Sequence, residues 1–129
     1  MLNTLPQNER KASLSETERL FSQGDKFMAY PFSVRFITLE EETCSVSVLL
    51  TSPKRYQKTA VNRNRAKRLL RETYRKNKQI IHQAIEKQNK RLVASISLVS
   101  KQLPTYQQTE KRMLEILNTI AKKISHEND

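Results

Sequence analysis

The segment 60–78 constrains the fold more than any other part of the chain, because it combines a helical apolar stripe with a dense array of cations. Apolar and small side chains recur there at steps of three and four residues, the period of an amphipathic helix with one buried side. Residues on the opposite side are Asn64, Arg68, Arg71, Arg75 and Lys78. A helix of this kind must pack its apolar stripe against another element, so the rest of the chain has to supply an apolar surface.

Positive charge is concentrated in this helix and its approaches. Residues 52–91 contain 14 Lys and Arg against 2 Glu, a net charge of +12, whereas the whole chain carries +11. Glu72 is spaced to pair with Arg68 and with Lys76, but two such ion pairs cannot balance so many cations. The excess charge favours a polyanionic partner, and nucleic acid is the first candidate.

Length and composition predict one domain over residues 1–129, with about 1–12 and 125–129 flexible. No apolar run approaches the roughly 20 residues that cross a membrane. The N-terminal residues lack the charged and then apolar pattern of a signal sequence, so we expect a cytoplasmic protein. One cysteine and two distant histidines form no metal-ligand pattern, so we expect neither a metal site nor catalytic residues in the protein itself.

Capping signals predict two further helices. Overlapping capping boxes that begin at Ser13 and Ser15 predict a short helix, which ends at Gly24 in a left-handed conformation. Thr105 is expected to cap a last helix that runs to about residue 124. The basic helix itself is expected to continue without a break to about residue 88.

Alternating patterns predict strands over 32–39, 43–51 and 92–100, with a hairpin loop at 40–42. One face of the resulting sheet would be apolar. The other would carry small hydroxyls, including Ser33 and Ser47, together with Arg35. This second face is either an ordinary solvent-facing surface or a shallow polar groove that accepts an extended single strand of nucleic acid.

The run Ala-Val-Asn-Arg-Asn-Arg-Ala-Lys-Arg-Leu-Leu-Arg-Glu over residues 60–72 closely resembles the long helix of the protein subunit of bacterial ribonuclease P. That family carries an Arg-Asn-Arg core followed by Lys-Arg-Leu-(Leu/Ile)-Arg. Leu-Phe-Ser-Gln-Gly at 20–24 resembles the family's first helix and its glycine stop, and Pro-Lys-Arg at 53–55 resembles its basic turn. The resemblance covers roughly residues 14–124.

The resemblance implies an α+β fold, in which a small mixed sheet of about four strands packs against three helices as in domain 2 of ribosomal protein S5. It implies a left-handed βαβ crossover, an exception to the usual handedness. The function implied is that of a ribonuclease P subunit, which binds the catalytic RNA and the 5′ leader of precursor tRNA and assists removal of the leader. The RNA would do the chemistry with Mg²⁺, and the protein alone would bind no cofactor, need no protein partner and contact no membrane.

Site residues are carried over by their match to the family motif. The residues expected to bind RNA are Lys54, Arg55, Arg63, Asn64, Arg65, Lys67, Arg68, Arg71 and Arg75. Those expected to line the leader cleft are Phe21, Arg35, Ser33 and Ser47. Positions that are often aromatic in the family hold Thr17 and Arg35 here, and Arg35 is expected to stack on a base or pair with a phosphate.

Two other functions stay open on composition alone. A structural RNA-binding protein, such as a ribosomal component, would have the same charge. A protein-only nuclease would need converging carboxylates or histidines. Glu40, Glu41 and Glu42 are adjacent, but nothing nearby supplies a base or a second ligand, so a solvated loop is the simpler interpretation.

Overall fold

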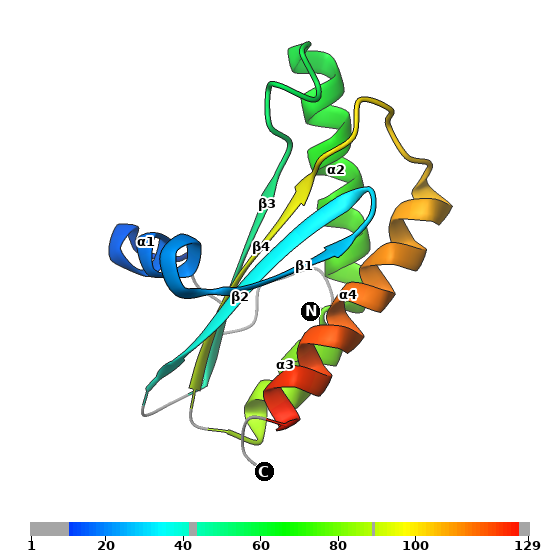
Figure 1. Ribbon diagram of the computed structural model, residues 1–129. Coiled ribbons are helices and arrows are strands. Elements are labelled where there is room, and N and C mark those ends of the chain that lie inside the picture. Colours follow the sequence, from blue (N-terminus) through cyan, green and yellow to red (C-terminus); the bar gives the residue numbers. More distant parts are fainter. Residues whose placement is uncertain (1–10, 42–43, 89, 127–129) are drawn as a thin grey trace.

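The computed structural model describes residues 11–41, 44–88 and 90–126, which form four helices and one sheet. Figure 1 shows how the helices are arranged around the sheet. The helices are α1 (Leu14–Gln23), α2 (Ala60–Asn77), α3 (Gln79–Glu86) and α4 (Tyr106–His126). The strands are β1 (Asp25–Ala29), β2 (Phe32–Glu40), β3 (Ser45–Thr51) and β4 (Lys90–Leu98). The predicted α+β class is confirmed, with four helices in place of three.

The sheet has the order β1-β2-β4-β3. Strands β1 and β2 are antiparallel, β2 and β4 are antiparallel, and β3 and β4 are parallel. The predicted hairpin at 40–42 is therefore wrong, because β4 lies between β2 and β3. Residues 91–96 of β4 are buried without interruption, which is the pattern of a strand covered on both faces and suits the interior of the sheet.

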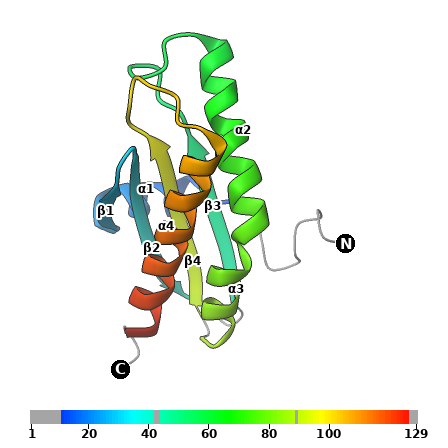
Figure 2. The ribbon, with the colours of Figure 1, turned by 90° about the vertical axis from the view of Figure 1, so that its right-hand side faces the viewer.

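The connection from β3 through α2 and α3 to β4 is left-handed. In Figure 2 the helices lie in front of the sheet, and the parallel strands β3 and β4 both point upward. The chain leaves β3, passes through the helices in front, and enters β4 to the left of β3. This agrees with the expectation drawn from the family and departs from the common right-handed rule.

The two faces of the sheet are covered unequally. Helices α2, α3 and α4 cover one face, whereas α1 lies alone on the other (Figures 1 and 2). Even-numbered side chains of β2 and β4, such as Phe36 and Ile96, join Leu70 and Leu117 in the main core. On the opposite face Leu20 of α1 packs with Leu39 and Val93 in a smaller cluster. The open part of the second face lies beside α1.

The predicted long helix is interrupted at Lys78, between α2 and α3. The interruption is slight, because Lys78 keeps helical dihedral angles and His82 N still donates to its carbonyl oxygen. Thr73 Oγ1 donates to Leu69 O at 2.8 Å and Asn77 Nδ2 donates to Thr73 O at 2.9 Å, and such side-chain bonds bend helices. Lys78, expected on the side opposite the apolar stripe, is buried instead, and His82 is buried as well.

Gly24 ends α1 as predicted, but its conformation is not left-handed. Its φ of −69° and ψ of 151° are extended values open to any residue. Glycine is required here by space, since a Cβ atom at this position would lie 2.4 Å from Leu20 O and 3.0 Å from Phe36 O. The residue therefore lets the end of α1 approach the backbone of β2 closely.

Of the two overlapping boxes expected for α1, that of Ser13 with Glu16 is present, whereas Ser15 lies inside the helix. Thr105 caps α4 through reciprocal hydrogen bonds with Gln108. Helix α4 extends to His126, past the point where we expect flexibility. Of the termini expected to be flexible, about 1–12 and 125–129, residues 1–10 and 127–129 lie outside the described residues. None of the helices in the described part of the chain combines the length and apolarity that a membrane crossing requires.

Candidate nucleic-acid interface

Helix α2 presents its cations on the side away from the core. Thr59 caps the helix by accepting a hydrogen bond from Asn62 N at 3.2 Å. Leu70 and Tyr74 are buried against the core. The exposed residues of the predicted RNA-binding set on α2 are Asn64, Arg65, Arg68, Arg71 and Arg75, and the half-buried ones are Arg63 and Lys67. The amphipathic division predicted from the sequence is therefore correct for α2.

Arg63 has a structural role as well. Its Nη1 donates to Gln57 O and to Lys58 O, both at 3.0 Å, so its guanidinium group holds the loop that leads into α2. The same loop is anchored from the other side by Gln57, which is buried and donates from Nε2 to Ser100 O at 2.7 Å. Sequence reasoning missed Gln57, since a lone glutamine in a polar loop gives no signal.

Lys54 and Arg55 are exposed in the turn that follows β3. Tyr56 N and Gln57 N both donate to Pro53 O, which closes the turn at 3.2 Å for each bond. The guanidinium carbon of Arg55 lies 4.9 Å from the centre of the Tyr56 ring. Because the loop is anchored at both ends, the two cations stand at a defined position beside the start of α2.

Ion pairs offset little of the charge on α2. Arg68 pairs with Glu72 at 2.9 Å, as predicted. Lys76 pairs with Glu110 of α4 at 3.0 Å instead of with Glu72, because α4 packs beside this part of α2. The hydrogen bond to Glu110 and the charge of that carboxylate raise the pKa of Lys76.

A buried arginine joins α1 to the sheet. The Arg91 side chain is 0% exposed and lies on the face of β4 that α1 covers. Its Nε and Nη2 donate to the two oxygens of Glu16, at 2.6 and 3.1 Å. It also donates to Ser45 Oγ at 3.1 Å, to Ser47 Oγ at 2.5 Å and to Lys11 O at 3.3 Å. Lys11, expected in a flexible arm, is thus part of this network.

The network perturbs the carboxyl group of Glu16. Its hydrogen bond with Arg91 lowers the pKa of Glu16 from 4.5 to about 2, against an opposing effect of burial. Glu16 Oε1 also accepts from Ser13 N at 2.9 Å, so the same carboxylate completes the capping box of α1 and anchors α1 to Arg91. The only signal in the sequence was an arginine directly before the apolar strand predicted at 92–100; its parallel register with Ser45 is set by the fold.

The residues predicted to line the leader cleft lie in two different places in the structure. Phe21, near the end of α1, is 49% exposed. The Arg35 guanidinium lies over its ring at 5.4 Å and donates to Phe21 O at 2.9 Å. Ser33 is half-buried on the same face, one alternating position before Arg35. Ser47 does not belong to this surface, because it is only 2% exposed and is bound to Arg91 beneath α1.

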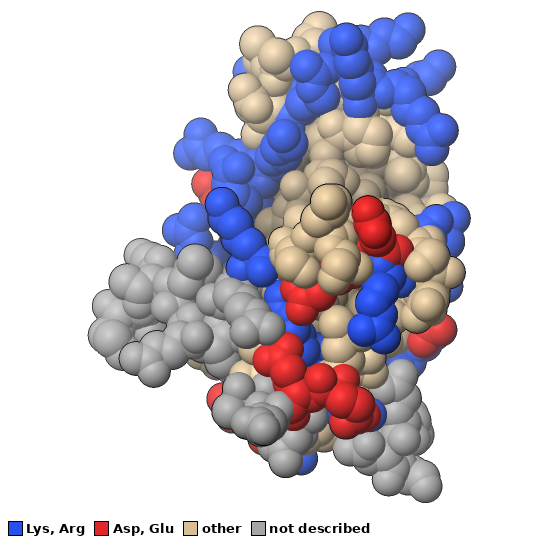
Figure 3. All heavy atoms as spheres, turned by 90° about the vertical axis from the view of Figure 1, so that its left-hand side faces the viewer, with Lys and Arg blue, Asp and Glu red and all other residues tan. Residues whose placement is uncertain are grey.

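Charge is distributed unevenly over this face of the molecule. Figure 3 shows Lys and Arg side chains on both sides of an uncharged strip at the upper end of the view, with Asp and Glu near the lower end. Glu40 is exposed, Glu41 Oε2 lies 3.8 Å from Arg91 Nε, and Glu42 lies outside the described residues. Within the described ranges, no three His, Cys, Asp or Glu side chains gather as metal ligands would.

The exposed cations of α2 and the polar sheet face beside α1 define an RNA-binding protein of the α+β class. The chain belongs to the ribonuclease P family, whose model matches residues 5–124. It is therefore a protein component of the ribonuclease P holoenzyme, and the protein itself is not catalytic. The family match does not favour the alternative of a ribosomal protein.

Relatives support the same assignment. The chain is 33% identical to the ribonuclease P protein component of Porphyromonas gingivalis ATCC 33277 over 119 residues, which is 91% of this chain and 86% of that protein. It is 38% identical to the ribonuclease P protein component of Chlorobaculum tepidum over 87 residues, 64% of this chain and 56% of that protein.

Solved structures of similar fold are also ribonuclease P proteins. The protein from Thermotoga maritima superposes with a TM-score of 0.62 at 19% identity, covering 85% of this chain and 96% of that one. The Staphylococcus aureus protein gives a TM-score of 0.56 at 22% identity, and the match covers 91% of this chain and 97% of that one. Because both structures are less than 25% identical in sequence to this chain, their similarity establishes the fold alone.

Proposed function

We propose that this chain binds the catalytic RNA of ribonuclease P through α2 and the turn before it, and holds the 5′ leader of precursor tRNA beside α1. The observation that carries the proposal is the exposed row of cations on α2. Few of these positive charges are balanced by an ion pair. Arginine suits this role because its planar guanidinium binds phosphate in a bidentate manner and stacks on bases. The family to which the chain belongs supports the choice of RNA.

The proposed leader site is the platform that Phe21 and Arg35 form together. An exposed aromatic ring offers a stacking surface, and Arg35 adds a positive charge beside it. Arg35 keeps donor groups besides the Nη1 that binds Phe21 O, and these suit a phosphate. Ser33 adds a hydroxyl one alternating position along β2. A single strand is the expected occupant, since its bases are free to stack.

The remaining features of the proposal concern the chemistry and the location. Mg²⁺ is proposed to bind the RNA, where the cleavage chemistry occurs, and the protein is proposed to act by binding and positioning. The complex is proposed to work in the cytoplasm and to require no second protein.

The direct test compares precursor tRNAs that differ only in leader length. The cognate catalytic RNA is assayed at low Mg²⁺ with and without the protein. We expect the protein to lower the KM for a substrate with a long leader and to have little effect on a substrate with a single leader nucleotide. Equal effects on both substrates would contradict the leader site, and no effect on either would contradict the whole proposal.

One substitution with a matched control tests the leader site by itself. Phe21→Ala is expected to weaken binding of precursor tRNA by about 5-fold or more, since stacking of one base contributes about 1–3 kcal/mol. Affinity for the catalytic RNA should stay the same. Arg19→Ala is the matched control, because Arg19 is also exposed on α1 but projects from another side of the helix. If Arg19→Ala and Phe21→Ala behave alike, the stacking interpretation is wrong.

A further inference from the structure

A groove of about 460 Å³ lies between α2 and the start of α4. Its volume is within the range of small-molecule sites, about 300–1,000 Å³. The residues that line it are Arg65, Arg68, Leu69, Glu72, Leu103, Pro104 and Tyr106. It belongs to the helical layer and not to the sheet face beside α1, so it is separate from the proposed leader site (Figure 1).

Both walls of the groove are held by neighbouring contacts. The wall from α2 is a single helix face, since residues 65, 68, 69 and 72 follow at steps of three and four. One turn further along, Lys76 pairs with Glu110 at 3.0 Å and so joins α2 to α4. On the other side, the reciprocal hydrogen bonds of Thr105 and Gln108 set Tyr106 as the first residue of α4.

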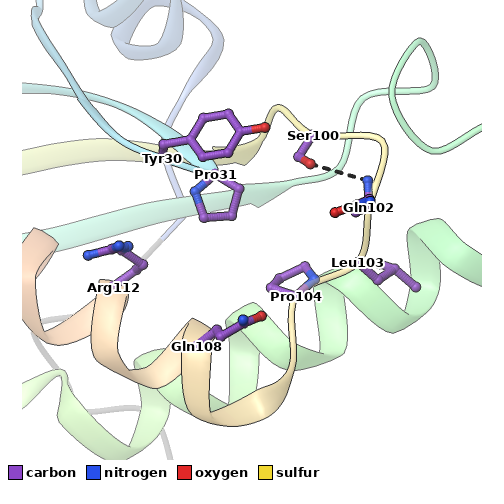
Figure 4. A pocket seen from close by; sticks show the side chains of 8 residues that line it. All are labelled: Tyr30, Pro31, Ser100, Gln102, Leu103, Pro104, Gln108 and Arg112. Atoms are coloured by element: carbon purple, nitrogen blue, oxygen red, sulfur yellow. Dashed lines mark hydrogen bonds between the residues drawn. The ribbon is translucent and has the colours of Figure 1, made fainter.

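The segment before α4 completes the floor. Leu103 and Pro104 also line a second cavity, of about 270 Å³, which Figure 4 shows from close by. In that view Leu103 points toward α2 and away from Tyr30, and Pro104 stands at the turn into α4. Leu103 and Pro104 therefore belong to both the groove and this cavity.

Apolar and cationic groups are segregated within the groove. Leu69, Leu103 and Pro104 are half-buried, and the Tyr106 ring is 36% exposed beside them. Arg65 and Arg68 are exposed at the rim, and Glu72 holds Arg68 through an ion pair of 2.9 Å. The interior thus suits a flat apolar group, and the rim suits an anion attached to it.

An unpaired nucleotide has this combination of parts. Its base is a flat ring that stacks on aromatic side chains, and its phosphate binds arginine. A base within a double helix is stacked and unavailable, so a paired region would reach only the arginine rim. The net charge of +12 on residues 52–91 favours an RNA strand over an apolar peptide as the occupant.

We propose that this groove holds one unpaired base of the catalytic RNA, stacked on Tyr106 with its phosphate at Arg65 and Arg68. This inference rests on the proposed function. The position of the groove in the helical layer assigns it to the catalytic RNA and not to the leader.

The test measures the affinity of the full chain for the cognate catalytic RNA across a series of salt concentrations. Tyr106→Ala is expected to weaken binding about 5- to 150-fold, the equivalent of about 1–3 kcal/mol for one stacked base. The salt dependence should not change, because no phosphate contact is lost. Tyr106→Phe keeps the ring and should bind within about 2-fold of the parent. Leu114→Ala, an exposed residue of α4 outside the groove, is the matched control.

Two additional measurements distinguish a loss of stacking from a folding defect in the Tyr106→Ala variant. Tyr106→Leu fills similar space without an aromatic face, so it should weaken binding while the unfolding temperature stays close to that of the parent. A benzophenone crosslinker in place of Tyr106 should react with unpaired nucleotides of the catalytic RNA.

The outcomes separate the two proposals. If the parent binds the RNA tightly and Tyr106→Leu binds equally well, the groove proposal is wrong and the proposed function stands. Crosslinks that map only to paired regions, or to another protein, would also overturn it. If the parent itself does not bind the catalytic RNA, the proposed function fails and the groove proposal fails with it.

Discussion

Glu16→Gln removes the carboxylate that holds the buried Arg91, and it should loosen α1 from the sheet. The pKa of Glu16 is lowered from 4.5 to about 2. At 1.36 kcal/mol per pKa unit this depression corresponds to ~3 kcal/mol. The Glu16 side chain is 18% exposed, so solvent screens part of its interaction with Arg91. We expect the free energy of unfolding at pH 7 to fall by about 2–3 kcal/mol.

The same side chain predicts how stability depends on pH. The pKa of Glu16 in the folded protein lies below its ordinary value of 4.5, so the stabilisation is fully present above about pH 4.5. It is lost as the pH falls from there toward about 2, where the carboxylate is protonated in the folded state. The Glu16→Gln variant lacks this contribution and should show a flatter fall in stability over that interval.

Urea unfolding followed by circular dichroism, at pH 7 and in steps down to about pH 2.5, measures both effects. Glu18→Gln is the matched control, since Glu18 is an exposed carboxylate on the same helix. Hydrogen exchange over residues 14–23 should rise in Glu16→Gln, because α1 has Leu20 as its one buried residue and few other attachments. If Glu16→Gln lowers the free energy of unfolding by less than about 0.5 kcal/mol, and its stability depends on pH as in the parent, the role assigned to the Arg91 network is refuted.

Three other variants test separate parts of the structure. Arg65→Ala combined with Arg68→Ala should weaken RNA binding and lower the salt slope by about 1–2, with folding stability changed by no more than about 0.5 kcal/mol, as measured by binding titrations and thermal melts. Leu70→Ala should lower the free energy of unfolding by about 2–5 kcal/mol in urea titrations, because it opens a cavity in the core. Gly24→Ala should destabilise the protein by more than about 1 kcal/mol despite its permissive dihedral angles, since the new methyl group meets Leu20 O; an unchanged melting temperature would contradict this.

Local features of this protein could be predicted from the sequence. The capping boxes at Ser13 and Thr105 and the division of α2 into buried and exposed sides depend on residues within one or two helical turns. The motif at 63–71 identified the family for the same reason, since it is a continuous run. The interruption at Lys78 escaped prediction, because hydrogen bonds from Thr73 and Asn77 to the backbone do not alter the apolar period.

Features formed by distant residues could not be predicted. A hairpin between β2 and β3 was the simplest pairing for neighbouring strands, but the order of strands depends on how the whole chain packs. Ser47 has the alternation of a surface residue and is nevertheless buried, because Arg91 and Glu16 meet above it.

The sequence by itself determined which segments are helical, where the charge lies and which family the chain belongs to, since these follow from spacing along the chain. Only the tertiary structure decided that β4 lies between β2 and β3, that Gly24 is needed for close approach to β2, and that Arg91 anchors α1. Arg91 and Glu16 are 75 residues apart in the sequence. Burial of a charged group is stable only when such a partner is brought to it, and the folded chain alone settles which residues meet.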